Sequence, residues 1–184
     1  MDLIDEIERF HPRCEQEAAD RILMLDFMRT HDDFLLRDNQ IAHMTASAWT
    51  VNERRTKVLM VYHRIYDSWS WVGGHADGDA DLRRVALREL REETGVSEAR
   101  LADETILSLE VLTVSGHVRR GSYVPSHLHL NVTFLLEADE QGVLTRNPDE
   151  NLDVRWFSFE DALSASTEPW MVDHVYRKLV ARSL

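Results

Sequence analysis

The sequence of 184 residues contains one cysteine, Cys14, and no long run of apolar residues. A single cysteine excludes an internal disulfide and is typical of a protein from a reducing compartment. Because no apolar run reaches about 18 residues, we expect no membrane span and no membrane association. The first ten residues, MDLIDEIERF, are acidic and lack the basic start and apolar centre of a signal peptide. By default, we expect a cytoplasmic protein.

Positive charge is also scarce. The chain has 21 Lys and Arg residues against 33 Asp and Glu residues, which gives a net charge of −12, and no basic cluster stands out. This balance argues against binding to a nucleic acid polymer or to an anionic membrane. Hydrophobic residues make up 43% of the chain and charged residues 29%. These are values of an ordered globular protein whose length suits one domain with a substantial core.

Hydrophobic periodicity separates a helical beginning from a mixed remainder. Residues 1–37 are expected to be helical, with Pro12 in a first turn and an apolar stripe that packs on the main domain or on a second copy of the chain. The stripe consists of Ala18, Ala19, Ile22, Leu23, Leu25 and Met28. No repeat, low-complexity tract or linker is present. We therefore expect an N-terminal helical extension over residues 1–37 and a single domain over residues 38–184, with a homodimer as one way to cover the extension.

Strand patterns dominate from about residue 41. They predict strands over 44–51 and 57–63, joined by a charged hairpin turn, and further strands over 105–118, 127–138 and 154–157. Helices are expected before Gly95, near 159–165, and from Pro169 to about Arg182. Mixed strands with helices on both sides predict an α/β (α+β) fold in which a mixed sheet forms an α/β/α sandwich.

Three carboxylates, Glu89, Glu92 and Glu93, occur at positions i, i+3 and i+4 of the helix expected before Gly95. They would share one helix face, where like charges cost about 0.2–0.5 kcal/mol per pair. The helix dipole disfavours anions in the last turn by about 0.3–1 kcal/mol each. A divalent cation would turn this cost into a binding site. The alternative is a solvated acidic face, with Arg88 neutralising Glu92.

The segment from Gly74 to Val96, GHADGDADLRRVALRELREETGV, resembles the Nudix box, whose spacing is fixed over 23 residues. The positions in register are Gly74, Arg88, Glu89, Leu90, Glu92, Glu93, Gly95 and Val96. One position departs from the box, because Ala80 stands where a glutamate is expected. Its neighbour Asp79 would take that role after a one-residue rearrangement of the turn. The resemblance extends more loosely over residues 45–181.

The resemblance to the Nudix family implies a Nudix-type fold and a metal-dependent diphosphohydrolase. Glu89, Glu92 and Glu93 would be ligands of Mg²⁺ or Mn²⁺, and a backbone carbonyl at the Gly73–Gly74 pair, with Gly74 in the box position, would complete the shell. One of these glutamates, or a later one, would also act as the base. Arg88 would orient the carboxylates. The implied reaction is hydrolysis of a diphosphate linked to a nucleoside or a similar group, with release of a phosphate-terminated product.

Three further residues are candidates for the substrate side of the site. His75 follows the glycine pair and would contact a phosphate, or would simply occupy the turn. Arg119 lies in the segment 115–127 with Arg120 and Tyr123, a candidate substrate loop whose arginines could equally be solvated. Glu150 resembles the loop glutamate that some Nudix proteins use as an extra ligand or base, and its alternative is a solvated carboxylate.

Histidine and tryptophan pairs on two strands have structural alternatives that we prefer. His127 and His129 share a strand face, as a zinc pair would, but the sequence places no cysteine or third histidine beside them, which favours pocket lining or exposure. Trp69 and Trp71 would share one face of the strand that leads to Gly73. Stacking on a base is possible there, and packing is favoured.

Two other functions remain open. A catalytically weak Nudix-like domain that binds a ligand as a sensor would explain the loss of a glutamate at Ala80. Retention of the three helix carboxylates argues for the enzyme, because a sensor gains nothing from side chains that repel one another. The isopentenyl diphosphate isomerase branch of the same fold relies on a cysteine within the domain, whereas Cys14 precedes the strands.

Overall fold

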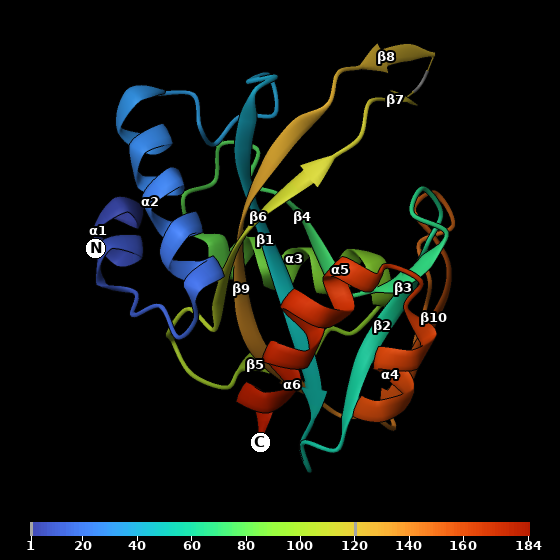
Figure 1. The fold of residues 1–184 in the computed structure, drawn as a ribbon. Coiled ribbons are helices and arrows are strands. Elements are labelled where there is room, and N and C mark those ends of the chain that lie inside the picture. The colour runs from blue at the N-terminus through green and yellow to red at the C-terminus, as the bar shows by residue number, and fades with distance from the viewer. Residues whose placement is uncertain (1, 120) are drawn as a thin grey trace.

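The computed structural model describes residues 2–119 and 121–184. Its centre is an eight-stranded mixed sheet in the order β10-β2-β1-β9-β5, with β3 on β2, β4 on β1 and β6 on β9 (Figure 1). The strands of this sheet are β1 (Ala42–Asn52), β2 (Lys57–His63), β3 (Ser68–Ser70), β4 (Val72–His75), β5 (Ala99–Leu101), β6 (Ser108–Val114), β9 (His127–Ala138) and β10 (Asn151–Ser158). β7 (His117–Arg119) and β8 (Ser122–Val124) form a small separate hairpin.

Helices cover both faces of the sheet, as the sequence predicted for an α/β/α sandwich (Figure 1). They are α1 (Leu3–Arg9), α2 (Glu15–Thr30), α3 (Leu82–Thr94), α4 (Phe159–Ala165), α5 (Pro169–Met171) and α6 (Arg177–Ser183), with a π-helical turn η1 (Val172–Tyr176) between the last two. The extended helix from Pro169 agrees with the sequence, and the π turn inside it was not foreseen.

The two longest strands, β1 and β9, run parallel at the centre of the sheet, while the other pairings are antiparallel. Side chains of β1 alternate between the two faces. Met44 and Ala46 face α3 and join the core cluster that contains Val85 and Leu90. Trp49 lies on the opposite face, where it stacks on Tyr176 of η1 with ring centroids 5.7 Å apart. The sheet therefore separates two apolar cores.

The N-terminal segment differs from the continuous helix expected over residues 1–37. Pro12 lies between α1 and α2, and residues 31–41 form turns and bends. Polar side chains stabilise this turn, because the Asn39 amide donates to Asp33 at 2.7 Å and accepts from the backbone amide of Ile41 at 3.0 Å. Such side-chain bonds compete with helical backbone bonds. The prediction of a helix was therefore wrong beyond Thr30.

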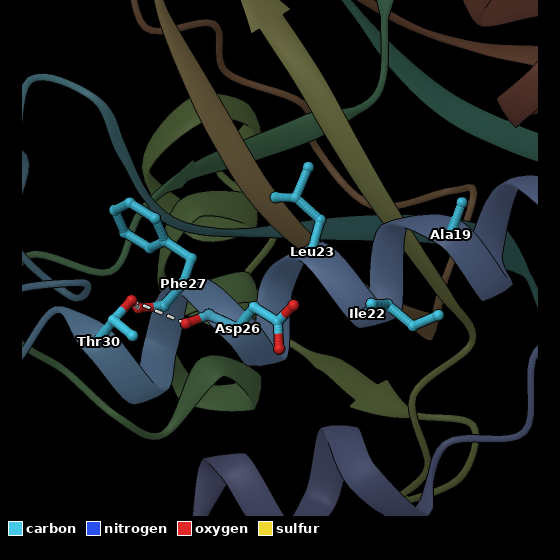
Figure 2. A pocket seen from close by; sticks show the side chains of 6 residues that line it. All are labelled: Ala19, Ile22, Leu23, Asp26, Phe27 and Thr30. Carbon is cyan, nitrogen blue, oxygen red and sulfur yellow. Dashed lines mark hydrogen bonds between the residues drawn. The ribbon is translucent and has the colours of Figure 1, made fainter.

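The apolar stripe expected on this segment is divided between the core and the surface. Leu25 and Met28 are buried, whereas Ile22 and Leu23 are 60% and 42% exposed. The exposed side chains line an open hollow along α2 (Figure 2), formed by Ala19, Ile22, Leu23, Asp26, Phe27 and Thr30. Asp26 is the one charged residue in this lining, so the hollow lacks the set of catalytic or metal-binding side chains that an active site needs.

A buried ion pair fixes α2 to the rest of the molecule. Glu17 is fully buried, and its carboxylate accepts from both terminal nitrogens of Arg182 on α6, at 2.5 and 2.9 Å. Lys178 lies 3.4 Å from the same carboxylate. Burial alone would raise the pKa of Glu17, but Arg182, the backbone amide of Arg13 and Lys178 together lower it to about 2.

Strand predictions were most accurate where patterns were longest. The strands over 57–63 and 127–138 and the helix over 159–165 agree with β2, β9 and α4. The strand expected over 105–118 is instead divided into β6 and β7, and β5 was not expected. Within the part of the chain that the structure describes, no helix is long and apolar enough to cross a membrane.

Candidate functional site

Helix α3 carries the three candidate carboxylates, and both of its ends are capped. The Asp81 side chain accepts from the backbone amide of Arg84 at 3.2 Å, which caps the first turn. Gly95 closes the helix in the left-handed conformation, with φ of 74°, where glycine has no steric cost. The apolar side of α3 packs on β1 and β4, which turns the C-terminal half of the helix toward the glycine pair.

Glu93 is the most buried of the three carboxylates, at 3% exposure. Its Oε1 accepts from the backbone amide of Gly73 at 3.2 Å, and its Oε2 accepts from the Asn151 side chain at 3.1 Å. Burial raises the pKa of Glu93 to about 8, although both hydrogen bonds oppose the shift and the charge of Glu150 adds to it. Ionising Glu93 therefore costs free energy unless a cation lies nearby.

Glu89 lies against Gly74. A Cβ atom on Gly74 would fall on the Glu89 carboxylate, so this contact requires a residue with no side chain. One nitrogen of Arg88, Nη2, donates to Glu89 at 2.9 Å and to the backbone carbonyl of His75 at 3.0 Å. Burial raises the pKa of Glu89, with Arg88 opposing the shift and Glu92 adding to it.

Glu92 is exposed and faces a more open region. It lies in a hollow of about 440 Å³ along α3, lined by Arg84, Leu87, Arg88, Arg91, Glu92, Val96, Ser97 and Ala99. Three arginines line this side of the helix at positions i, i+4 and i+7, and two of them, Arg84 and Arg88, form ion pairs with carboxylates. Arg91 and Glu92 also line the hollow.

Glu150 lies in the turn before β10, and its position is close to the other carboxylates in space. Its charge contributes to the raised pKa of both Glu89 and Glu93. The turn is fastened to α3, because the backbone amide of Asn147 donates to the carbonyl of Glu93 at 3.3 Å. Asn151, which follows Glu150, contacts Glu93 directly. No pattern in the sequence indicates Asn151, since an isolated asparagine after a loop has many other uses.

Among the described residues, no hydrogen bond or ion pair links the Asp79 side chain to the three glutamates of α3. Both of its oxygens accept from Arg84, at 2.6 and 2.8 Å. Ala80 is exposed. The proposal that Asp79 takes the place of a missing glutamate therefore requires that Arg84 release it.

The segment 115–127 forms the β7–β8 hairpin, which extends beyond the end of β6 and β9 (Figure 1). The backbone of Arg119 lies in β7. Its side chain and the whole of Arg120 lie outside the described part of the chain. Tyr123 is 70% exposed. The expected substrate role of Arg119 stays a prediction.

The tryptophans near the glycine pair are packing residues. The strand expected through them is interrupted at Trp71, between β3 and β4. Trp69 packs edge-on against Phe157, with ring centroids 4.7 Å apart, and Trp71 packs edge-on against Tyr176 at 5.8 Å. Trp71 belongs to the second core cluster and Trp69 packs against it, which agrees with the preference for packing over base stacking.

Histidines gather at one end of the sheet. His43, His75 and His129 each bring a ring nitrogen within 4.8 Å of the others. His127 joins them, with its Nε2 atom 3.3 Å from Nε2 of His129. The argument that His127 and His129 lack a third histidine was therefore wrong, because β1 and β4 supply His43 and His75. Among the described residues, His43, His75 and His129 form the one group of three possible metal ligands whose donor atoms all lie within 4.8 Å of one another.

Among the described residues, Glu89, Glu92 and Glu93 do not form a group whose donor atoms converge as the histidine nitrogens do, but Glu89 and Glu93 still offer ligands for a hard divalent cation. Both are withdrawn from water and lie beside a glycine pair with no side chain in the way, and the charge of Glu89 adds to the raised pKa of Glu93. Carboxylate and carbonyl oxygens are the ligands that Mg²⁺ and Mn²⁺ prefer. A bound cation would offset the cost of ionising both groups.

Comparison with known proteins gives a match to the family model described as the NUDIX domain, over residues 42–182. Similar solved structures include an Ap4A hydrolase from C. elegans, at 18% identity and a TM-score of 0.53, covering 75% of this chain and 95% of that one. Another is the dihydroneopterin triphosphate pyrophosphohydrolase of E. coli, at 15% identity and 0.55, covering 75% and 94%. A NUDIX family hydrolase from Clostridium perfringens is 20% identical at 0.51, covering 74% and 95%. No curated protein matches.

Proposed function

Since this chain belongs to the Nudix family and is a Nudix hydrolase, we propose that it hydrolyses a small molecule in which a diphosphate links a nucleoside, or a similar group, to a second group, with Mg²⁺ or Mn²⁺ as cofactor. The observation that carries the proposal is the burial of Glu93 and Glu89 around Gly73 and Gly74. Ionised carboxylates in such a position lower the stability of the folded protein unless a cation binds to them.

Glu89, Glu92 and Glu93 would hold the cation, together with the backbone carbonyl of Gly74. When bound, the ion would neutralise charge on phosphate oxygens and lower the pKa of a coordinated water. Arg88 acts as a positioning residue, because its bond to Glu89 and its bond to the carbonyl of His75 fix that carboxylate relative to β4. Asn151 does the same for Glu93.

Water activation needs a carboxylate that can take up a proton close to the cation. We propose Glu150 for this role, because it is exposed, lies in the turn fastened to α3, and acts electrostatically on Glu89 and Glu93. Glu92 is the other solvent-exposed candidate. On the substrate side, His75 and Arg119 are proposed to contact phosphate.

The identity of the leaving group is not set by the fold. The two named enzymes among the solved structures, an Ap4A hydrolase and a dihydroneopterin triphosphate pyrophosphohydrolase, have different substrates by name and nearly equal similarity to this chain. Specificity in such folds is determined by loops around the common helix. A cytoplasmic location and a homodimer stay predictions.

A substrate screen tests the proposal. Nucleoside and sugar diphosphate compounds are incubated with the protein and Mg²⁺ or Mn²⁺, and products are identified by mass spectrometry. We expect a phosphate-terminated product from at least one class, its loss with EDTA, and its loss in Glu93→Gln. A full panel without metal-dependent release would contradict the proposal.

A ligand-binding sensor is the second candidate, favoured by one observation: Ala80 occupies the position of the first box glutamate, and Asp79 is held by Arg84. Calorimetry on the same panel separates the two functions. Tight binding of a nucleotide with no turnover in Mg²⁺ or Mn²⁺ supports the sensor, whereas turnover supports the hydrolase.

A further inference from the structure

Three strands that are distant in sequence bring histidines to one point. His43 comes from β1, His75 from β4 and His129 from β9, and one ring nitrogen of each lies within 4.8 Å of the others. The ring centroids of His43 lie 5.0 Å from His75 and 5.1 Å from His129. No carboxylate belongs to this group, so its donor atoms are all imidazole nitrogens.

Strand register explains the convergence. In the parallel pair β1–β9, His43 lies opposite His129, and in the antiparallel pair β1–β4, His75 lies opposite Thr45. Paired residues project to the same face of a sheet, and alternate residues along a strand do so as well. All three histidines therefore occupy the face opposite α3, at the end of β9 where the β7–β8 hairpin joins it (Figure 1).

His43 is held in the orientation of a metal ligand. It is 3% exposed, and its Nδ1 atom lies 3.0 Å from the backbone carbonyl of Asn39, to which it donates. This bond places the proton on Nδ1 and leaves the lone pair on Nε2. The Nε2 atom is buried and has no hydrogen-bond partner among residues 2–119 and 121–184. A backbone carbonyl on one nitrogen and a free lone pair on the other is the arrangement usual for ligating histidine.

His127 is oriented in the same way at the border of the group. Its Nδ1 atom donates to the carbonyl of Pro125 at 2.8 Å, so its Nε2 lone pair faces Nε2 of His129 at 3.3 Å. Two nitrogens bound to one tetrahedral zinc ion at about 2.0–2.1 Å each would lie about 3.4 Å apart. The observed separation therefore suits a shared cation as well as it suits a hydrogen bond.

We propose that His43, His75 and His129 form a binding site for Zn²⁺ or a similar late transition-metal dication, with His127 at its border. Neutral imidazole is a good ligand for such ions and a poor one for Mg²⁺. Burial lowers the pKa of His43 and lowers that of His129 to about 2, with neighbouring histidines adding to both effects. Burial therefore favours the neutral form of His43 and His129, which is the form that binds metal.

This site is separate from the glutamates of α3. Successive residues of β4 point to opposite faces: Gly74 meets the Glu89 carboxylate, whereas His75 joins the histidine group on the other face. The sheet therefore lies between a carboxylate site for a hard cation and an imidazole site for a softer one. A zinc ion at the second site would tie together the ends of β1, β4 and β9.

Metal analysis of the full chain tests the inference. Protein stripped with a chelator and dialysed is titrated with Zn²⁺ by calorimetry and analysed for bound zinc, and Co²⁺ is used as a spectroscopic probe of tetrahedral nitrogen ligation. We expect about one tightly bound zinc per chain. His129→Gln and His75→Gln should each weaken zinc binding by more than about 100-fold, because loss of a supporting residue alone costs about 10–100-fold. His174→Gln, at an exposed position on η1, should bind as the wild type does.

Two further measurements keep the outcomes distinct. Circular dichroism of the metal-free variants shows whether a loss of zinc binding reflects a loss of fold, and both substituted residues, His75 and His129, are only partly buried. Glu89→Gln/Glu93→Gln should abolish Mg²⁺-dependent turnover and retain the tight zinc. Zinc that disappears with the glutamates and survives His129→Gln would overturn the histidine site, as would the absence of tight zinc in the wild type. Either result leaves the hydrolase proposal intact.

Discussion

Gly74 on β4 and Glu89 on α3 are so close that a side chain on the first would occupy the place of the carboxylate of the second. The contact joins the sheet to the helix at the point where the cation is proposed to bind. Arg88 strengthens it, because the same Nη2 atom bonds Glu89 and the carbonyl of His75. The position of the Glu89 carboxylate is therefore determined from both sides.

Gly74→Ala should displace the Glu89 carboxylate. We expect a loss of about 1–3 kcal/mol of stability, as for other overpacked sites, and a larger loss of metal-dependent turnover. Gly142→Ala is the matched control, since a Cβ there would come no closer than 3.2 Å to a neighbouring atom. Stability follows from urea unfolding, and turnover from product release. Equal turnover in the two variants would contradict the proposed role of this contact.

Arg88→Ala and Arg84→Ala distinguish the two arginines on one face of α3. Arg88 contacts Glu89, whereas Arg84 contacts Asp79. Loss of a residue that positions a metal ligand costs about 10–100-fold in activity, so we expect that loss in Arg88→Ala and near wild-type kcat/KM in Arg84→Ala. If Arg84→Ala raises activity, release of Asp79 toward the site becomes the explanation. A strong loss in Arg84→Ala alone would show that the assignment is reversed.

Glu93→Gln should separate catalysis from stability. Burial raises the pKa of Glu93 to about 8, so the metal-free protein holds this group largely protonated at neutral pH, and a neutral amide replaces it at little cost. We expect turnover to fall by about 10²–10⁴-fold with no fall in Tm at neutral pH. Because the folded pKa lies above the ordinary value of 4.5, the metal-free wild type should lose stability relative to Glu93→Gln as the pH rises from about 4.5 to about 8. A Tm that drops sharply in Glu93→Gln at neutral pH would show that the charge is structural.

The lowered pKa of Glu17 predicts that the folded protein loses stability in acid. Its pKa in the folded protein is about 2, against an ordinary value of 4.5. The resulting contribution to the free energy of unfolding, about 3 kcal/mol, is complete above about pH 4.5 and is lost as the pH falls toward 2. The wild type should therefore approach Glu17→Gln in stability over this range. Glu15→Gln, at an exposed position on the same helix, should follow the wild type, and urea unfolding at several pH values is the measurement.

The proposed glutamate site can be predicted from the sequence because its residues are close along the chain. Glu89, Glu92 and Glu93 share a helix whose spacing fixes their common side, and the glycine pair precedes that helix by a short turn. Long alternation also identified β9. By contrast, the helix expected over 31–37 failed because Asp33 and Asn39 form side-chain bonds that replace helical ones. Propensity alone does not reveal such a competition.

The histidine group was not accessible from the sequence. His127 and His129 are visibly on one face of a strand, but His43 and His75 join them only through the pairing of β1 with β9 and β4. Register between distant strands is set by packing of the whole sheet. Asn151 is a similar case, since its contact with Glu93 depends on how the loop before β10 returns to α3.

The parallel alignment of β1 with β9 has a consequence for how the chain reaches its native state. Partners in this pair, such as Thr45 and Asn131, are 86 positions apart, and contacts of such long range slow folding because a large loop must close before they form. During synthesis, β1 must wait for β9 with part of its hydrogen-bonding edge unpaired. We expect nascent chains that stop before His127 to be prone to aggregation and to need chaperones until the central strand arrives.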